Sequence, residues 1–542
     1  MMNEFACSLA SALAFSFGGP APVPGHPMET VLQDDAEFLY HDPAEVRRSV
    51  RTLAEIGVDR VRLTASWSAL APDSDQARRP RFDATDSLAY PDDGFERLDR
   101  AVREVRDAGM QTMIDVAFFA PSWSVDPRHA GDPRPAWRPS PRQFGLFTRA
   151  IAERYGGSFQ DPEGDPGENL PAVRLWTTWN EPNHSTFLRP QWESAGGRRR
   201  PASPHHYRRM HNTAYDQLKA VSSDNSVLVG GLAAFGERGR GAKSNIGPLL
   251  FTRELACVDS RLRPLRRRAC RDFEPLRADG FAHHPYSLDT TPDARDLSQD
   301  RVQIGELDRL TSLLSQLYAA GRFEKPQPLY LTEYGYETSP PDPTGHPPED
   351  HARYLGLATF LAWRNTDVQM FAQFLLKDKG PKLSEPAGSP ARWRDYQSGL
   401  FAHDGPAKSA VLQGFKLPIH AEAIQNADGT QEAVVFGQVR PLSGPQRVTI
   451  QRLDPELGWI SEPSLAVIWA AGSEGCGDFS TDGDGFYGRR MAYWPGATYR
   501  AVWTRPDGVD ELSPAVTTGP VRPVPGGAVG ALAPIPLVPP PA

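Results

Sequence analysis

Residues 43–64 have the sequence PAEVRRSVRTLAEIGVDRVRLT, in which a helical pattern leads directly into a strand pattern. Apolar residues recur there at helical spacing, so the sequence predicts an amphipathic helix over 43–56. These residues are Val46, Val50, Leu53 and Ile56. Gly57 follows, where helices commonly end, and the apolar run at 60–64 predicts a buried strand. A helix that leads into a buried strand is the repeating unit of a parallel α/β fold.

The same alternation extends from about residue 29 to residue 417. Eight short apolar segments are the expected strands: 30–32, 60–64, 111–116, 174–179, 227–231, 280–283, 328–332 and 368–375. Eight strands with helical crossovers predict a (β/α)8 TIM barrel with long loop insertions, which we assign to residues 28–417. A doubly wound sheet is the alternative, but no glycine-rich dinucleotide turn follows the first strand.

The helical patterns stop after Pro418. Strand patterns separated by Gly, Pro and Asp turns lie at 433–439, 446–451, 465–470, 486–492 and 498–504. They predict a C-terminal antiparallel β-sandwich domain over residues 418–520. Residues 521–542 are mostly Pro, Gly, Ala and Val, and form a tail that cannot bury a core. Two domains also suit the length of 542 residues, which exceeds what one hydrophobic core usually supports.

Charge and motif content exclude several classes of function. The chain has 59 basic and 67 acidic residues, for a net charge of −8, so we expect no nucleic-acid partner. No segment beyond the N-terminus is long and apolar enough to cross a bilayer, which predicts no membrane span. The absence of a C-x-x-C pair and of an H-E-x-x-H motif argues against a structural zinc or zincin site, and we expect neither metal nor cofactor.

Cysteine usage and the N-terminus bear on localisation. Cys257 and Cys270 lie 13 positions apart in an arginine-rich segment, which suits a local disulfide in an oxidising compartment, whereas Cys7 and Cys476 have no obvious partners. Residues 1–27 contain a weak apolar stretch and then Gly and Pro, like the end of a signal peptide, although no Lys or Arg precedes it. We expect a secreted or cell-surface protein, with a cytoplasmic protein as the alternative.

Two short segments place a carboxylate where a predicted strand ends. Trp179-Asn180-Glu181-Pro182-Asn183 ends the fourth strand, and Leu331-Thr332-Glu333-Tyr334-Gly335 ends the seventh. The C-terminal ends of barrel strands meet at one mouth, so the two glutamates can face each other. Retaining glycoside hydrolysis needs one carboxyl group that protonates the leaving oxygen and one that attacks the anomeric carbon. Glu181 suits the first role and Glu333 the second, although either glutamate alone is more often a surface residue.

The two motifs also resemble a known clan. Asn180-Glu181-Pro182 resembles the acid/base signature of clan A glycoside hydrolases, and Thr332-Glu333-Tyr334-Gly335 resembles that clan's nucleophile strand. The resemblance spans residues 29–417 and is greatest to family 39 and family 5-like enzymes. It implies that Asn180 binds the sugar 2-hydroxyl. It also implies that Arg62 keeps the nucleophile ionised, since an adjacent cation lowers a carboxyl pKa; a surface salt bridge is the alternative.

The sixth strand is followed by His283-His284-Pro285-Tyr286, where clan members place a His or Tyr near the nucleophile. Adjacent residues on a strand point to opposite faces, so at most one of the two histidines can face the site, which argues against a metal pair. His284 and Tyr286 are therefore candidates for hydrogen bonds at the site, with a structural role as the alternative.

Aromatic residues just beyond strand ends are candidates for stacking on sugar rings. They are Trp67, Trp123 and Phe187, and loop packing is the alternative for each. The eighth strand departs from the clan's pattern, because many members have a tryptophan where this chain has Gln373 and Phe374.

These features predict a glycosidase that cleaves O-glycosidic bonds with retention of configuration by a two-glutamate double displacement. The expected partner is an oligosaccharide, a polysaccharide or a glycoside substrate, which the mildly acidic charge balance also suits. One alternative is a catalytically inactive carbohydrate-binding protein on the same fold. Another is a transglycosidase, which would share every residue of the site.

Overall fold

The structure is a computed structural model that describes residues 27–523, apart from 92, 298–299, 395, 427, 442–443, 463–465 and 470–477. The signal-like segment expected at 1–27 lies outside the described residues except for its last position. Cys7, Cys476 and the expected tail beyond Pro523 also lie outside them.

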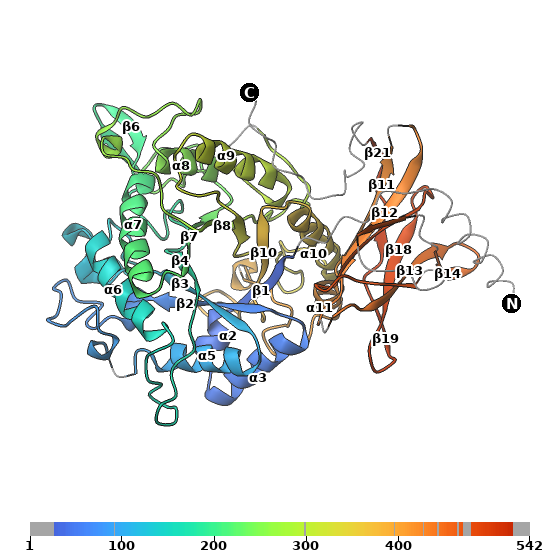
Figure 1. The fold of residues 1–542 in the computed structure, drawn as a ribbon, viewed down its shortest axis with the longest axis horizontal. Coiled ribbons are helices and arrows are strands. Elements are labelled where there is room, and N and C mark those ends of the chain that lie inside the picture. The colour runs from blue at the N-terminus through green and yellow to red at the C-terminus, as the bar shows by residue number, and fades with distance from the viewer. Residues whose placement is uncertain are drawn as a thin grey trace.

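Eight parallel strands close into a barrel, in the spatial order β1-β10-β9-β8-β7-β4-β3-β2 (Figure 1). The strands are β1 (Glu29–Gln33), β2 (Arg60–Ser66), β3 (Gln111–Ala117), β4 (Leu175–Thr178), β7 (Ser226–Ala233), β8 (Gly280–His284), β9 (Leu329–Leu331) and β10 (Val368–Phe374). Each of the eight predicted segments overlaps one of them. The expected TIM barrel is therefore confirmed.

Helices surround the barrel strands (Figure 1). They are α2 (Asp35–Leu39), α3 (Pro43–Glu55), α4 (Trp67–Leu70), α5 (Glu96–Asp107), α6 (Pro141–Arg154), α7 (Ser203–Val221), α8 (Pro248–Leu255), α9 (Leu307–Ala319), α10 (Pro348–Trp363) and α11 (Ser409–Lys416). A two-stranded hairpin, β5 (Trp192–Ala195) and β6 (Arg198–Pro201), lies in the connection between β4 and α7. The predicted helix over 43–56 corresponds to α3.

The ends of α3 show why this segment is helical. The Asp42 side chain caps the first turn by accepting the backbone N–H groups of Ala44 and Glu45, and Pro43 occupies the first helical position. Gly57 has φ +81°, and an added Cβ would lie 2.7 Å from the Cβ of Arg440. Glycine therefore allows both the turn into β2 and close contact with the C-terminal region.

Side chains inside the barrel change from apolar to polar toward the C-terminal ends of the strands. A buried apolar level contains Val31, Met113, Leu175, Leu228, Ala282, Met370 and Ala372. Residues two positions further along a strand share its face. At those positions β1, β3, β4 and β8 carry Gln33, Asp115, Thr177 and His284. The apolar level packs the barrel, and the next level supplies polar groups to its mouth.

Two further sheets follow α11. One contains β11 (Ile419–Gln425), β12 (Gln431–Gln438), β15 (Ala466–Trp469), β17 (Phe486–Ala492) and β21 (Arg522–Pro523). The other contains β13 (Arg447–Asp454), β14 (Gly458–Ser461), β16 (Asp478–Ser480), β18 (Thr498–Thr504), β19 (Asp510–Leu512) and β20 (Val516–Thr517). Their pairings are antiparallel except for β11 with β21. One buried cluster takes Val435 from the first sheet and Ile450 and Trp503 from the second. An antiparallel C-terminal region is therefore present.

The first of these sheets packs against the barrel through α10, and Figure 1 shows α10 and α11 between the barrel and the C-terminal strands. The Trp363 ring centre lies 5.3 Å from that of Phe436 and 5.8 Å from that of Phe486. Phe360 lies 5.1 Å from Phe436. These rings join the main buried cluster of the barrel, so the last turn of α10 and the sheet share one core.

Arginines and a disulfide organise the segment after α8. Cys257 and Cys270 are joined, with Cα atoms 5.7 Å apart, which confirms the predicted local crosslink. The Arg208 guanidinium donates to the carbonyl oxygens of Leu255 at 2.7 Å and Ala269 at 2.6 Å, one near each half of the disulfide. This arginine-rich loop is thus held by a crosslink and by bonds to its backbone.

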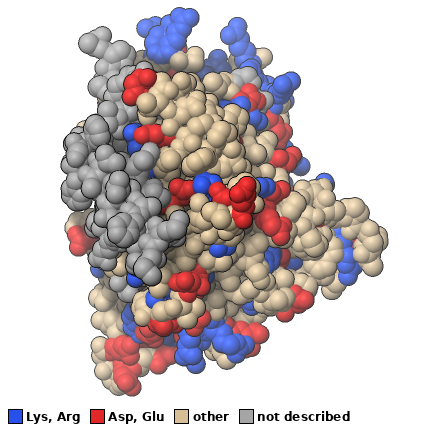
Figure 2. All heavy atoms as spheres, turned by 90° about the vertical axis from the view of Figure 1, so that its right-hand side faces the viewer, with Lys and Arg blue, Asp and Glu red and all other residues tan. Residues whose placement is uncertain are grey.

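The outer surface agrees with the mild net charge. On the face in Figure 2, the described residues place acidic and basic side chains among uncharged ones. No helix within the described part of the chain has both the length and the apolar character needed to span a membrane.

Replacing Trp363 by Ala should lower the free energy of unfolding by about 3–5 kcal/mol, because the fully buried ring would leave a cavity between α10 and the sheet. Urea unfolding followed by circular dichroism measures this. Trp494→Ala is the matched control, since that ring is 48% exposed and should change stability by less than about 0.5 kcal/mol. Equal losses in the two variants would contradict a shared core.

Candidate active site

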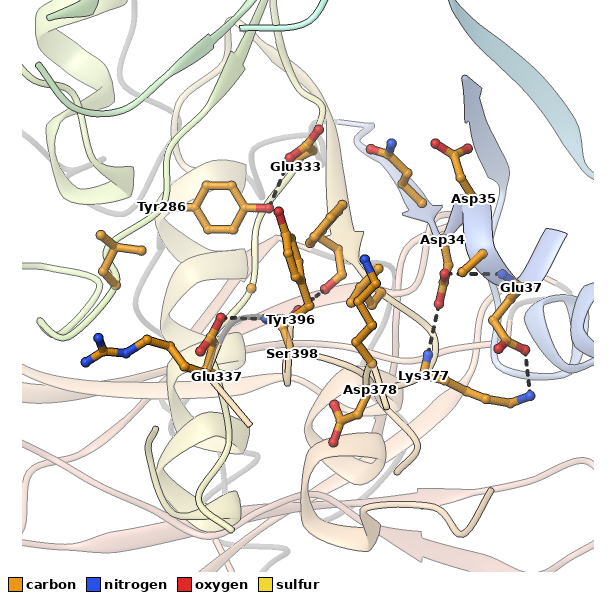
Figure 3. A pocket seen from close by; sticks show the side chains of 18 of the residues that line it. Asp34, Asp35, Glu37, Tyr286, Glu333, Glu337, Lys377, Asp378, Tyr396 and Ser398 are labelled. Atoms are coloured by element: carbon orange, nitrogen blue, oxygen red, sulfur yellow. Dashed lines mark hydrogen bonds and ion pairs between the residues drawn. The ribbon is translucent and has the colours of Figure 1, made fainter. Parts of the chain in front are cut away.

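A cavity of about 1230 Å³ opens at the C-terminal mouth of the barrel. Loops that follow β1, β4, β8, β9 and β10 contribute to its lining. Glu181, Glu333, Asn180 and Tyr286 all line it, as the position of their motifs at strand ends predicted. Figure 3 shows part of this lining, with Glu333 and Tyr286 facing each other across one end.

Arg62 lies beneath the cavity and joins the groups around it. Its side chain is fully buried on β2. Nη1 donates to Gln33 Oε1 and, at 2.7 Å, to Glu333 Oε1; Nη2 donates to Asp115 Oδ2 at 2.9 Å and to Asn180 Oδ1 at 3.1 Å. The surface salt bridge considered for Arg62 is therefore wrong, because the guanidinium forms buried charge-assisted bonds to groups on β1, β3 and the ends of β4 and β9.

Glu333 is held in one orientation by donors on both of its oxygens. Arg62 binds Oε1, and the Tyr286 hydroxyl donates to Oε2 at 3.2 Å. Burial raises the pKa of Tyr286 well above 10, and the charges of Glu333 and Glu181 raise it further, so this hydroxyl keeps its proton. Both oxygens of Glu333 therefore accept a hydrogen bond from a side chain of the barrel.

Glu181 follows β4 in an unusual backbone turn. Trp179 has φ +77° and Glu181 has φ +40°, values that residues with a Cβ rarely adopt. The turn is anchored by the Glu181 N–H, which donates to the Gly231 carbonyl at 2.9 Å. Asn183 anchors its far end, donating to the carbonyls of Ala233 and Ile246 and accepting the Ala233 N–H. Strain of this kind costs of order 1–3 kcal/mol per residue and is concentrated at functional sites.

The environment of Glu181 favours its neutral form. Burial raises the pKa of Glu181, and the positive charges of His184 and Arg62 only partly oppose the shift. The two glutamates also differ in their immediate partners. Glu333 contacts the Arg62 guanidinium, whereas Glu181 contacts the ring of His284.

His284 lies between the two glutamates. Its Nδ1 atom is 2.9 Å from Glu181 Oε1 and 3.5 Å from Glu333 Oε2. Burial lowers the pKa of His284 to about 4, so the ring is neutral near pH 7. Among the described residues its Nε2 has no hydrogen-bond partner, which favours the tautomer with the proton on Nδ1, where an oxygen of Glu181 accepts it. A Cβ on Gly231 would lie 2.3 Å from Nε2, so only glycine leaves room for this ring.

His283 points away from the site. Its Nε2 lies 2.8 Å from the Val302 carbonyl, whereas His284 contacts the two glutamates, so the two adjacent histidines point in different directions, as expected for neighbours on a strand.

The two carboxyl groups are close together. One carboxylate oxygen from each glutamate and a ring nitrogen of His284 all lie within 4.8 Å of one another. Such a triad has the donor types of a metal site, but a cation there would lie beside the Arg62 guanidinium, which repels it and already neutralises Glu333. The arrangement suits carboxylate chemistry more than metal binding.

The cavity has an aromatic side near Glu181. Phe118 and Phe187 line it, with ring centres 4.7 Å apart, and His184 and Thr186 accompany them. Phe187, one of the three aromatic residues considered for sugar stacking, therefore lines the cavity.

The part of the cavity lined by the loops after β1 and β10 is polar (Figure 3). Asp34 accepts the backbone N–H groups of Leu376 and Lys377, each at 3.1 Å, and Lys377 Nζ lies 2.5 Å from Glu37. These bonds tie the loop after β1 to the loop after β10. Burial raises the pKa of Asp34 to about 7.

Trp67 and Trp123 occupy another place. Neither lines the cavity, and the Trp67 ring is fully buried among Trp123, Phe144 and Phe147. Trp123 donates its indole N–H to the Pro72 carbonyl and packs on Phe82. This placement corrects the expectation of sugar stacking, since both rings pack the barrel wall behind α4 and α6.

Sequence reasoning missed three polar groups around Arg62. Asp115 is fully buried on β3 and also accepts a hydrogen bond from the Thr177 hydroxyl at 2.7 Å. Gln33 is the last residue of β1 and accepts from Arg62. Asp35 begins α2, accepts the Thr64 N–H at 3.0 Å and lines the cavity. A signal for Asp115 was present, because an acid inside an otherwise apolar strand needs a partner. Burial raises the pKa of both Asp115 and Asp35.

No family model matches the chain, and no curated protein matches it. Several solved structures are similar to it. A glucosidase from Croceicoccus marinus is 12% identical over 88% of this chain and 98% of its own, with a TM-score of 0.47. The β-glycosidase from Thermosphaera aggregans is 16% identical over 72% and 96%, with a TM-score of 0.40. GH5_18 from Streptomyces cattleya, in complex with GlcNAc, is 14% identical over 72% and 80%, with a TM-score of 0.42. These TM-scores are too low to bear on function, which depends on the geometry of the site.

Replacing Arg62 by Ala should lower the free energy of unfolding by about 3–5 kcal/mol, because it leaves Asp115 and Glu333 buried without their cation. Equilibrium unfolding in urea measures the loss. Arg47→Ala is the control, since Arg47 is half exposed and its pair with Glu104 should contribute about 0–1 kcal/mol. If the two variants were equally stable, the guanidinium would not organise the mouth of the barrel.

Proposed function

We propose that this protein is a glycoside hydrolase of clan A that cleaves O-glycosidic bonds with retention of configuration. The observation that carries the proposal is the separation of the two carboxyl groups. Oxygens of Glu181 and Glu333 lie within 4.8 Å of each other. Retaining sites have carboxyl groups about 5–5.5 Å apart, whereas inverting sites need about 6.5–9.5 Å to admit a water molecule.

In the first step, Glu333 attacks the anomeric carbon and forms a glycosyl–enzyme ester, while Glu181 gives its proton to the departing oxygen. Burial of Glu181 keeps that proton available. Arg62 stabilises Glu333 as a carboxylate before attack, and the Tyr286 hydroxyl orients its other oxygen. The leaving group departs on the side of Glu181, against Phe118 and Phe187.

In the second step, Glu181, now ionised, takes a proton from water, and the water oxygen replaces Glu333 at the anomeric carbon. Two displacements restore the original configuration. His284 can donate to the ionised Glu181 through Nδ1, and this bond steadies the carboxylate between the two steps. Asn180, held by Arg62, would contact the sugar 2-hydroxyl.

The two C-terminal sheets support a further part of the proposal, namely a β-sandwich domain over 418–520 that supplies no catalytic group. Their shared buried cluster supports this arrangement, and a crystal structure of the region would test it. The Cys257–Cys270 disulfide supports action outside the cytoplasm. Detection of the protein in the culture medium of its native host would test that location. The closer resemblance to family 39 and family 5-like enzymes stays a prediction, and screening defined glycans would test the substrate class.

The two glutamates should respond differently to substitution. Glu333→Gln should abolish turnover of every glycoside, because no covalent intermediate can form. Glu181→Ala should slow substrates with poor leaving groups by about 10²–10⁴-fold and spare those whose leaving groups need no proton. Kinetics on a panel of aryl glycosides measures both effects, with added azide giving a glycosyl azide of retained configuration in Glu181→Ala.

Glu55→Gln is the control for these variants, since Glu55 is exposed on α3 outside the cavity. An inverted first product, observed by NMR during turnover, would contradict the double displacement. Wild-type protein without turnover on any glycoside would favour a carbohydrate-binding role.

The pH dependence of kcat/KM should report the ionisation of Glu181. The acid must be protonated in the first step, so kcat/KM should fall as pH rises through the pKa of Glu181. Because burial raises that pKa, the fall should lie at higher pH than for an exposed glutamate. In Glu181→Ala, assayed on a substrate that needs no acid, this alkaline limb should disappear. A limb unchanged in that variant would assign it to another group.

A further inference from the structure

The segment between η6 (Pro390–Arg392) and α11 crosses the mouth of the barrel and brings Tyr396 into the cavity. The ring is 45% exposed, and the residue has φ +69°. Figure 3 shows the ring extending from this segment with its hydroxyl end toward Tyr286 and Glu333. The two phenols are close enough to interact. Burial and the charges of the two glutamates are the larger causes of the raised pKa of Tyr286, and the charge of Tyr396 raises it further.

The backbone of Tyr396 is held in place from two sides. Its N–H donates to Glu337 Oε1 at 2.8 Å, and its carbonyl accepts the Lys379 N–H at 2.9 Å. Glu337 comes from the same strand end as Glu333, so the position of Tyr396 is tied to the segment that carries the nucleophile. This anchoring also maintains a left-handed backbone that residues with a Cβ seldom adopt.

The ring itself has neighbours that leave part of it open. Its centre lies 6.0 Å from that of Phe374 and 4.8 Å from Lys379 Nζ. Two residues further on, the Ser398 carbonyl accepts from Gln373 Nε2 at 2.7 Å, and the Ser398 hydroxyl donates to the Phe374 carbonyl at 2.6 Å. Gln373 and Phe374 thus bond to Ser398, and the Phe374 ring also contacts Tyr396. This is the pair of residues found where many clan members have a tryptophan.

The Tyr396 ring is partly exposed, and its hydroxyl end points toward Glu333 from an anchored backbone. A large aromatic side chain in such a position suits contact with a ligand. We propose that Tyr396 is a specificity-determining residue that binds the glycone, the sugar unit attacked by Glu333, with its ring against the sugar and its hydroxyl bonded to a sugar hydroxyl. Glu337 is a positioning residue for Tyr396. This inference rests on the proposed glycosidase function.

The ligand class that follows is a glycone with a free hydroxyl on the Tyr396 side. Removal of that one hydroxyl from the sugar should have the same effect on binding as removal of the phenol oxygen. A hydroxyl-to-hydroxyl bond of this kind is directional, so it selects among stereoisomers as well as among substituted sugars.

The test uses full-length protein and the aryl glycoside that the wild type hydrolyses best. Tyr396→Ala should raise KM, and the inhibition constant of the free parent sugar, by about tenfold, with a smaller change in kcat. Tyr396→Phe should weaken inhibition by the parent sugar but leave inhibition by one of its monodeoxy derivatives unchanged. Tyr318→Ala is the control, because Tyr318 is 42% exposed on α9 and does not line the cavity.

The positioning role of Glu337 has its own readout. Glu337→Ala should raise the inhibition constant of the parent sugar, while Glu337→Gln, which keeps an oxygen that can accept the Tyr396 N–H, should restore it. If Tyr396→Ala matched Tyr318→Ala in an active enzyme, the role of Tyr396 would be overturned and the proposed function would stand. If wild-type protein hydrolysed no glycoside, the proposed function would fail first, and this inference with it.

Discussion

The mouth of the barrel depends on the Arg62 guanidinium. Burying this cation is costly, and the cost is offset only because its donors meet oxygens of Gln33, Asp115, Asn180 and Glu333. Those oxygens belong to β1, β3 and the segments that follow β4 and β9. One side chain therefore sets the positions of Glu333 and of the turn that contains Asn180 and Glu181, through direct hydrogen bonds to Glu333 and Asn180. The strained turn at Trp179 and Glu181 is tolerated because Arg62 binds Asn180 within it and Asn183 anchors its far end.

The same site gives two chemically identical side chains different properties. Glu333 has direct contact with a cation and a phenol, whereas Glu181 has burial and the neutral ring of His284. This difference in surroundings suits the proposed roles of Glu181 as proton donor and Glu333 as nucleophile. The cavity walls follow the same division, with phenylalanines on the side of Glu181 and charged or hydroxylated groups toward the loops after β1 and β10.

The C-terminal region contacts the barrel at α10 and at the first barrel strand. The sheet that contains β12 and β17 covers the aromatic end of α10, and Arg440 donates to the Thr30 hydroxyl on β1. The first barrel strand is therefore held from outside as well as by its neighbours. The loops at the opposite end of the barrel remain available to shape the cavity.

Local sequence pattern was sufficient for the fold. Apolar runs of strand length, helices with one apolar face and glycine after α3 predict eight βα units, and the lack of a glycine-rich dinucleotide turn after the first strand favoured a barrel over a doubly wound sheet. The same pattern placed Glu181 and Glu333 at strand ends, and barrel geometry brings strand ends together. Arg62, Asn180, His284 and Tyr286 were candidates because the motifs resemble those of clan A enzymes, and each lies on or just beyond one of these strands.

Tertiary structure decided what local pattern leaves open. An aromatic residue after a strand can turn into the mouth or into the wall, and the choice depends on the helix that packs there; α6 receives Trp67, whereas Phe187 stays in the cavity. Tyr396 lies in a segment without periodic pattern, and contacts with distant residues, such as its bond to Glu337 59 positions away, bring it to the site. Strand direction is a local property of the chain, but the partners of a loop side chain are set by contacts between distant segments, which have no signature in neighbouring residues.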